Sequence, residues 1–231
     1  MVFTILIKIY LCEIVCYKDG EKLGQLFTIG HSQHSMNYFI GLLNKYGIDY
    51  LLDVRSTPYS KYAEQYNKEN ISRELNSVNI SYSFMGKYFG ARPQNVELYN
   101  DEGYLDFERV RESQDFNKGI ENVILGLNQG HRIALMCTEK EPIDCHRAIL
   151  VARAFEMRTI YAKHILSSGK ILTQQQLDDQ LLQKYFPDRR QLSLFTYEKQ
   201  ISEEEYLTEA YKKRNIEIGY YIDNTKKVLV M

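Results

Sequence analysis

The chain has 231 residues, which suits one α/β domain of ordinary size with some appended structure. Apolar residues make up 44% of it and charged residues 26%, the balance expected of a globular protein in water. The formal net charge of -1 excludes an overall electrostatic field that would attract nucleic acid or an anionic membrane, although it leaves room for local basic patches.

The first 25 residues differ in character from the rest of the chain. The opening MVFTILIKIYLCEIVC is apolar, but Lys8 and Glu13 interrupt it, and the run is too short to span a bilayer. It also lacks the basic leader and the small-residue cleavage site of a signal peptide. Four cysteines in a chain of this length do not indicate a disulfide framework. We interpret residues 1–25 as an N-terminal extension, such as an added strand, and expect a cytoplasmic protein that does not contact a membrane.

From residue 26 onward, short apolar strands alternate with helical segments. A β run covers residues 26–30, and residues 35–47 then show the apolar spacing of a helix that a glycine would end. Residues 48–56 are an apolar strand that turns polar near its end. Residues 56–67 form a loop, because a proline stops any helix that begins before it.

The same alternation continues through the middle of the chain. The next elements are helix 68–80, strand 80–86, loop 86–107, helix 108–129, strand 131–137, helix 144–157 and strand 159–166. Short strands separated by helices indicate βαβ units, and therefore a mostly parallel sheet flanked by helices. We predict an α/β domain over residues 26–189.

The last part of the chain has a different character. Residues 202–215, SEEEYLTEAYKKRN, are charged and favour a helix, and residues 216–230, IEIGYYIDNTKKVLV, resemble a small hairpin. We interpret residues 190–231 as a C-terminal helical and hairpin extension that packs on the α/β domain, not as an independent domain.

Reactive side chains directly follow three of the predicted strands. They are His31 and Ser32, then Asp53 and Arg55, and then Cys137 and Glu139. The carboxyl ends of parallel strands lie along one edge of a sheet, and this edge is where such folds bind ligands. The sequence therefore predicts a pocket at this edge.

A second reactive group opens the predicted helix over residues 144–157. Asp144 is a favourable N-cap residue, so Cys145, His146 and Arg147 would occupy the first three helical positions. Unpaired backbone N–H groups and the helix dipole favour an anion there. They also lower the pKa of a thiol, with help from Arg147 or a protonated His146. Cys145 is thus a candidate thiolate, and Arg147 with the helix N-terminus is a candidate anion cradle.

Structural roles remain open for several of these residues. Cys137 at the end of a buried strand could be an inert core thiol. Asp53 and Arg55 lie two residues apart, so they could form a mutual salt bridge. His31 could merely cap the next helix. A metal site built from His31, Cys137, Cys145 and His146 is conceivable. We predict no metal ligand, because C-x7-C-H matches no familiar zinc spacing and adjacent Cys and His rarely turn to one ion.

Four stretches of the chain resemble an uncharacterised family, domain of unknown function 488. The stretches FTIGHSQHS, LLDVRSTPYSKY, YSFMGKYFGARP and LMCTEKEPIDCHRAILVAR occur in the order of the family motifs, and the resemblance covers about residues 26–170. It implies a compact α/β domain and a site, but no reaction. Carried over position by position, the polar signature of the family falls on Gly30, His31, Ser32, Asp53, Arg55, Pro58, Ser60, Gly90, Arg92, Cys137, Glu139, Cys145, His146 and Arg147.

We therefore predict an enzyme with a pocket at the carboxyl edge of the sheet, in the class of a Cys-dependent transferase or hydrolase. The candidate catalytic residues are Cys145, Cys137, His31, His146, Asp53 and Glu139. The candidate substrate-binding residues are Ser32, Arg55, Ser60, Arg92 and Arg147. The expected substrate is an anionic small molecule, such as a nucleotide or a phosphorylated metabolite. The sequence assigns no cofactor.

Two other functions stay open. The first is a module that binds nucleic acid or nucleotides without catalysis. Its phosphate contacts would be Arg55, Lys87, Arg92 and Arg147, and its stacking platforms would be Tyr82, Tyr88 and Phe89. The second is a structural metal-binding domain.

Overall fold

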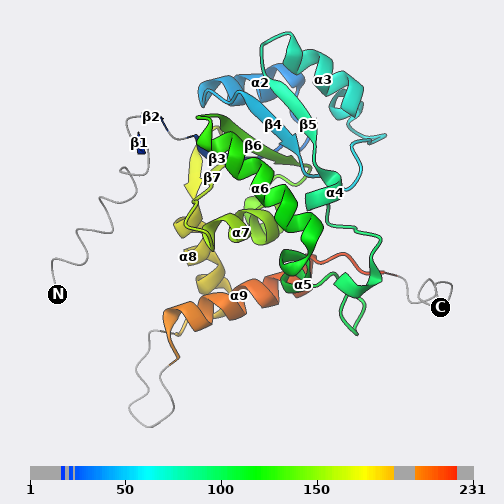
Figure 1. Cartoon of the computed structure of the whole chain (residues 1–231). Helices are drawn as coiled ribbons and strands as arrows, with labels where there is room; N and C mark the ends of the chain where they lie inside the picture. The colour runs from blue at the N-terminus through cyan, green and yellow to red at the C-terminus, as the bar shows by residue number, and fades with distance from the viewer. Residues whose placement is uncertain (1–16, 19–20, 23, 190–200, 223–231) are drawn as a thin grey trace.

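The structure is a computed structural model that describes residues 17–18, 21–22, 24–189 and 201–222. Its centre is a six-stranded sheet with the strand order β5-β4-β6-β3-β7-β8 (Figure 1). The strands are β3 (Gln25–Gly30), β4 (Tyr50–Asp53), β5 (Ser81–Phe84), β6 (Arg132–Cys137), β7 (Lys163–Ile165) and β8 (Ile171–Thr173). Neighbouring strands are parallel except for the antiparallel pair β7 and β8. The prediction of a mostly parallel α/β fold is confirmed.

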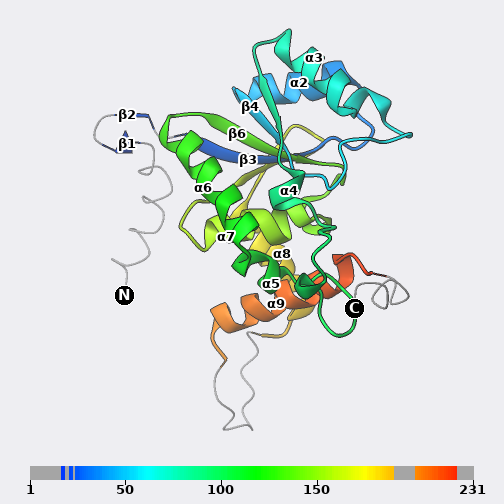
Figure 2. The same ribbon diagram turned by 45° about the vertical axis from the view of Figure 1, so that its right-hand side comes forward.

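Helices cover both faces of the sheet (Figure 2). They are α2 (Met36–Lys45), α3 (Lys68–Asn76), α4 (Gly86–Phe89), α5 (Phe107–Glu112), α6 (Gln114–Asn128), α7 (Arg153–Glu156), α8 (Gln174–Tyr185) and α9 (Glu203–Ile218). Shorter turns are the 3₁₀ helices η1 (Glu64–Tyr66), η2 (Val96–Leu98) and η3 (Pro142–Asp144) and the π-helix η4 (Arg147–Ala152).

Side-chain alternation along β6 shows how the sheet divides the core. Ala134 and Met136 belong to the buried cluster that includes the apolar faces of α2 and α3. Ile133, Leu135 and Cys137 point the other way, into the cluster that includes α6, η4 and α7. Burying a Leu or Ile side chain contributes about 1.5–3 kcal/mol to the stability of the fold, so the side chains on both faces of the sheet stabilise it. Cys137 therefore faces η4, the element that comes after Cys145.

Several element boundaries differ from the predictions. The predicted helix 108–129 is two helices, α5 and α6, because the hydroxyl of Ser113 accepts a hydrogen bond from the Phe116 N–H and starts a new helix there. The predicted loop 86–107 contains α4 and η2. The strands predicted over 48–56 and 159–166 are shorter. Sequence reasoning did not find β8 and α8.

The structure describes only part of each chain end. Two-residue strands β1 (Tyr17–Lys18) and β2 (Glu21–Lys22) pair antiparallel within the predicted N-terminal extension, whose other residues up to 23 lie outside the described part. Residues 216–218 of the predicted hairpin are the end of α9, and residues 223–230 lie outside the described part. In the part of the chain that the structure describes, every helix is too short or too polar to traverse a lipid bilayer.

Helix α9 packs against the rest of the fold. Leu207, Ala210 and Tyr211 belong to the same buried cluster as α7 and α8. Asn215 accepts a hydrogen bond from the backbone N–H of Phe107 at 2.8 Å and donates one to the carbonyl of Leu105 at 2.8 Å. The division into a domain over 26–189 and an extension over 190–231 stays a prediction.

Candidate functional site

The carboxyl ends of β3, β4 and β6 lie side by side. Backbone pairing continues past the strands, because the His31 N–H donates to the Cys137 carbonyl at 2.9 Å and the Val54 N–H donates to the Met136 carbonyl at 3.0 Å. The loop after β6 leads through η3 into η4. This edge therefore gathers the residues that were predicted from three separate strand ends, together with those that precede η4.

Three donor atoms converge at this edge: the Sγ atoms of Cys137 and Cys145 and the Nδ1 atom of His146. All three lie within 4.8 Å of one another. Nδ1 is 3.8 Å from each sulfur. We call these three residues the Cys–Cys–His triad. The adjacent Cys145 and His146 turn to one point, contrary to the expectation drawn from their spacing.

The backbone explains why adjacent residues turn to one point. Cys145 is extended, with φ −134° and ψ 137°, whereas His146 is already helical. The Cys145 carbonyl accepts from the N–H groups of Ala148 and Ile149, so the helical hydrogen bonds begin at Cys145, and His146 is the N-cap of η4. The prediction that Asp144 would be the N-cap is wrong. Asp144 ends η3, and its carboxylate pairs with Arg214 of α9.

A backbone carbonyl fixes the orientation of the His146 ring. Its Nε2 lies 3.0 Å from the carbonyl oxygen of Val54. A carbonyl oxygen only accepts hydrogen bonds, so Nε2 carries a proton. In the neutral ring the lone pair is then on Nδ1, directed toward the two sulfurs.

Both thiols are buried, and the ionisation of each one depends on the other. Cys137 is 6% exposed and Cys145 is 1% exposed. Burial alone would raise the pKa of Cys145, but the Cys137 thiol and the Arg147 charge lower it well below its ordinary value. The hydrogen bond with Cys145 and burial raise the pKa of Cys137. The pair therefore favours one thiolate, on Cys145, and one thiol.

Arg147 braces the loop above the triad. It is fully buried, and its guanidinium donates to the carbonyls of Glu139 at 2.7 Å and Lys140 at 3.1 Å. Its Nε has no hydrogen-bond partner in the described residues. The two nitrogens that face the loop carry four of the five N–H groups of the guanidinium, so this side chain stabilises the loop. Its positive charge also favours a thiolate on Cys145. The predicted role as an anion cradle has no support in these contacts.

Glu139 stands on the loop that Arg147 holds. Its side chain is exposed, unlike the triad. Partial burial raises the pKa of this carboxyl, and the charge of Cys145 raises it further. The Glu139 carboxylate is therefore within electrostatic reach of the Cys145 sulfur.

A second buried network adjoins the triad. The carboxylate of Asp53 accepts from Arg55 at 2.9 Å (Nε) and 2.6 Å (Nη2), and from the Tyr82 hydroxyl at 2.8 Å. Arg55 also donates to the Tyr66 carbonyl at 2.7 Å and lies 3.4 Å from His31 Nε2. Asp53 raises the pKa of Arg55 against the opposing effect of burial. Of the two roles left open for this pair, the mutual salt bridge is the one that the structure contains.

His31 is part of this internal network. The ring is buried, stacks on the Tyr66 ring at 4.1 Å and donates through Nδ1 to the Ser32 carbonyl at 2.9 Å. Burial lowers the pKa of His31 to about 4, and the Arg55 charge adds to this effect, so the ring is neutral at pH 7. Ser32 has φ +47°, an unfavourable conformation for a residue with a side chain. This bend turns the Ser32 carbonyl toward the ring.

Two predicted substrate-binding residues make their contacts elsewhere. The Ser60 hydroxyl accepts from the Tyr62 N–H at 3.1 Å, a local turn contact. The guanidinium of Arg92 lies over the Tyr220 ring at 4.7 Å. Their substrate-binding roles stay predictions without a contact to the triad.

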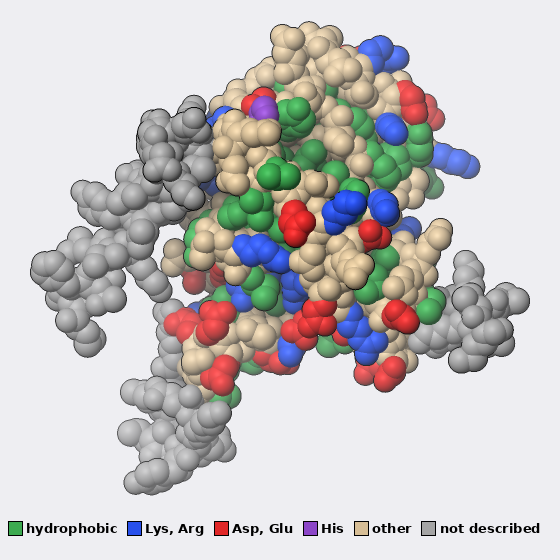
Figure 3. Space-filling model, viewed as in Figure 1, with side chains coloured by type: hydrophobic (Ala, Val, Ile, Leu, Met, Phe, Trp, Pro, Cys, Tyr) green, Lys and Arg blue, Asp and Glu red, His purple; other side chains and the backbone are tan. Residues whose placement is uncertain are grey.

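The nucleic-acid alternative gains little from the structure. Phe89 is fully buried against Phe116, so it offers no face to a base, and the Tyr82 hydroxyl is engaged by Asp53. On the face shown in Figure 3, basic and acidic side chains are intermingled and no continuous basic patch forms. Strong phosphate-backbone binding usually needs such a patch.

Sequence reasoning missed two contributors to this edge, Val54 and Tyr66, and gave a third, Tyr82, a different role as a stacking platform. The Val54 carbonyl fixes His146, the Tyr82 hydroxyl completes the Asp53 shell, and Tyr66 supports both His31 and Arg55. Alternation along the strand after residue 80 could have placed Tyr82 near Asp53. Nothing in the sequence marks Val54 or Tyr66, because their contributions are a backbone carbonyl and a ring face.

Comparison with known proteins gives one family. Residues 35–154, more than half of the chain, match the family model described as "Domain of unknown function DUF488". All three triad residues fall within the matched range. Searches of curated proteins and of solved structures found no match.

Proposed function

We propose that this chain, which belongs to the family of domain of unknown function DUF488, is a metal-dependent enzyme whose ion is bound by Cys137, Cys145 and His146. One observation carries this proposal: the sulfur atoms and the imidazole nitrogen of the triad lie within 4.8 Å of one another and share a common centre. Thiolate and imidazole ligands are typical of Zn²⁺, with a tetrahedral arrangement.

The distances support a zinc-like ion. Bond lengths of about 2.3 Å to sulfur and about 2.0–2.1 Å to nitrogen place tetrahedral ligand atoms roughly 3.5–3.8 Å apart. His146 Nδ1 lies 3.8 Å from both sulfurs, so an ion would need only small side-chain movements.

The surroundings of the ligands support the same role. A histidine ligand usually donates its second ring N–H to a carbonyl or a carboxylate, as His146 does to Val54. Metal binding also needs deprotonated thiols. The Arg147 charge and the His146 ring favour the first thiolate on Cys145, and the ion itself would favour the second.

Three protein ligands leave a fourth position for water. In the described residues, no fourth Cys, His, Asp or Glu atom joins the triad. A bound zinc ion would lower the pKa of a water molecule in that position, and Glu139, on the loop held by Arg147, would act as the general base. Glu139 would take one proton from the water that attacks the substrate and return it to the leaving group as the general acid. The reaction class we propose is therefore hydrolysis.

The proposed substrate is the predicted one, an anionic small molecule. Arg55 and Arg147, the predicted anion-binding residues of this edge, are buried and bound to Asp53 and to backbone carbonyls. Neither supplies a free cation.

A thiolate nucleophile is the second candidate. The lowered pKa of Cys145 favours it. The burial of Cys145, a residue that is 1% exposed, disfavours direct attack of its sulfur on a substrate. A metal ion would use the same low pKa without needing the sulfur to reach solvent.

Metal analysis of the purified full chain separates the two candidates. We expect one zinc-like ion per chain, or uptake of one Co²⁺ with the near-ultraviolet absorption of cobalt–thiolate bonds. The variants C137S, C145S and H146Q should lose the ion, whereas C12S, the same change at a cysteine outside the triad, should keep it. A folded protein that binds neither Zn²⁺ nor Co²⁺, but whose Cys145 reacts rapidly with iodoacetamide, would establish the thiolate alternative.

A further inference from the structure

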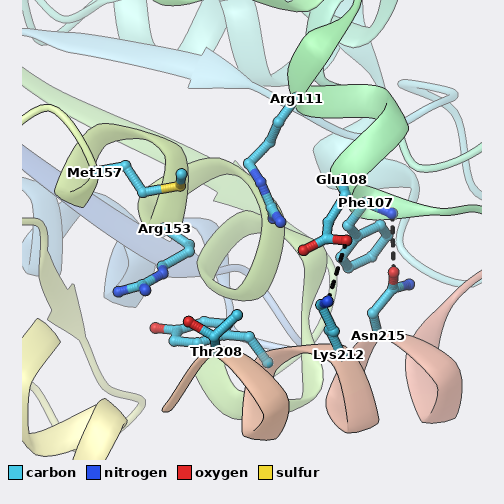
Figure 4. A pocket seen from close by; sticks show the side chains of 9 residues that line it. Phe107, Glu108, Arg111, Arg153, Met157, Thr208, Lys212 and Asn215 are labelled. Carbon is cyan, nitrogen blue, oxygen red and sulfur yellow. Dashed lines mark hydrogen bonds and ion pairs between the residues drawn. The ribbon is translucent and has the colours of Figure 1, made fainter. Parts of the chain in front are cut away.

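A pocket outside the triad lies between α5, α7 and α9 (Figure 4). Its volume of about 80 Å³ exceeds several times the 10–15 Å³ or so that one water molecule needs. Its polar lining includes Glu108 and Arg111 from α5, Arg153 from α7, and Thr208, Lys212 and Asn215 from α9. None of the residues in the proposed metal site lines it.

Arg111 is the unusual member of this lining. In Figure 4 its side chain reaches from α5 into the space between α7 and α9. Throughout residues 24–189 and 201–222, the Arg111 guanidinium makes no hydrogen bond or ion pair. Burial lowers its pKa, the Glu108 carboxylate partly opposes this effect, and the neighbouring Arg153 charge adds to it. A partly buried cation without a partner costs free energy, which a bound anion would offset.

The other charges of the pocket are already balanced. Arg153 pairs with Glu156 at 2.8 Å and with Glu204 at 3.3 Å. Lys212 pairs with Glu108 at 3.6 Å. The lining thus carries the three cations Arg111, Arg153 and Lys212 against the one carboxylate of Glu108, and within the described residues Arg111 is the cation that forms no ion pair.

We propose that this pocket binds a small oxyanion, such as a phosphate group, through the guanidinium of Arg111. The planar fork of arginine donates two parallel hydrogen bonds to the oxygens of such an anion. Thr208 adds a hydroxyl that makes no hydrogen bond within the described part of the chain, and Lys212 adds a nearby ammonium. The volume suits a single anionic group and excludes a whole nucleotide.

Binding at this place would couple an anion to the position of α9. The anion would contact α5 through Arg111 and α9 through Thr208 and Lys212. A ligand that binds only the folded state raises its stability with concentration, so phosphate should stabilise the docked helix.

The test uses the full chain with inorganic phosphate as the probe and chloride at equal ionic strength as the reference. Titration calorimetry and thermal unfolding should show saturable binding of phosphate to the wild type. R111Q should bind about tenfold more weakly or worse, the effect of losing a charge-assisted hydrogen bond. R73Q is the matched control, since it removes the same charge from the exposed end of α3.

One further signature distinguishes binding from a structural role. Without phosphate, R111Q should be at least as stable as the wild type, because it removes an unpaired charge. In saturating phosphate the order should reverse. K212Q provides a second variant, with weaker phosphate binding expected. The proposal is overturned if phosphate and chloride give the wild type the same melting temperature, or if R111Q and R73Q bind phosphate equally.

Discussion

Replacing Asp53 with asparagine should strongly destabilise the fold. The carboxylate is fully buried, and it accepts two hydrogen bonds from the Arg55 guanidinium and one from the Tyr82 hydroxyl. In D53N the guanidinium of Arg55, only 5% exposed, still contacts the Tyr66 carbonyl and the His31 imidazole, but it has lost its anionic partner. Removing one partner of a buried ion pair costs about 3–5 kcal/mol, because the other charge stays buried and uncompensated.

Urea unfolding followed by circular dichroism measures this loss. For a chain of this size, 3–5 kcal/mol corresponds to a fall of roughly 6–20 °C in melting temperature. The control is E74Q, which breaks the exposed ion pair of Arg73 and Glu74 at 3.8 Å and should cost about 0–1 kcal/mol. If D53N costs no more than E74Q, then Arg55 is not an internal cation, and it regains its predicted role as a free anion-binding group.

Three more variants test other parts of the structure. Burial lowers the pKa of His164 to about 3, so below pH 6.5 the unfolded chain binds a proton that the folded protein does not bind. The stability of the fold should therefore decrease between about pH 6.5 and 3. In H164Q, thermal scans should show a smaller decrease over this range. Burial raises the pKa of Asp178 from 3.8 to about 8, so the stability of the fold should fall as pH rises between these values. D178N should become more stable relative to the wild type as pH rises. A stability difference between D178N and the wild type that stays constant between pH 4 and 8 would refute this. A methyl group on Gly30 would lie 1.9 Å from the Glu139 carbonyl oxygen, so G30A should displace the loop above the triad and weaken Zn²⁺ binding. Competition with a chelator measures the zinc affinity. An affinity equal to that of the wild type would contradict the described packing.

The sequence was sufficient to predict the sheet and its reactive edge. Apolar runs of strand length alternate with helical segments, and this pattern leaves few alternatives to βαβ units. Once the sheet is parallel, topology places the ends of the strands together. Asp53 and Cys137 were therefore assigned to one edge without knowledge of the strand order.

The triad could not be predicted from spacing, because it depends on a local change of backbone conformation. Cys145 is extended between η3 and η4, and this arrangement accompanies the pairing of Asp144 with Arg214, 70 residues away. Local propensity favoured an ordinary helix with Asp144 as its cap. The conformation that turns Cys145 and His146 to one point is thus set by tertiary contacts.

The sequence also could not distinguish free cations from engaged ones. Arg55 and Arg147 are bound by backbone carbonyls of Tyr66, Glu139 and Lys140, and a carbonyl has no sequence signature. Arg111, in contrast, lies in a helix with unremarkable sequence and has no partner in the described residues. Burial and hydrogen-bond partners, not residue type, decide which arginine is available to a ligand.

X-ray absorption at the zinc edge of the zinc-loaded full chain tests the proposed metal centre most directly. We predict two sulfur ligands at about 2.3 Å and nitrogen or oxygen ligands at about 2.0–2.1 Å. C145S, which should lose the ion, should give no sulfur-ligated zinc under the same loading conditions. A spectrum with nitrogen and oxygen ligands alone, or one that C145S leaves unchanged, would contradict a metal centre built on the triad.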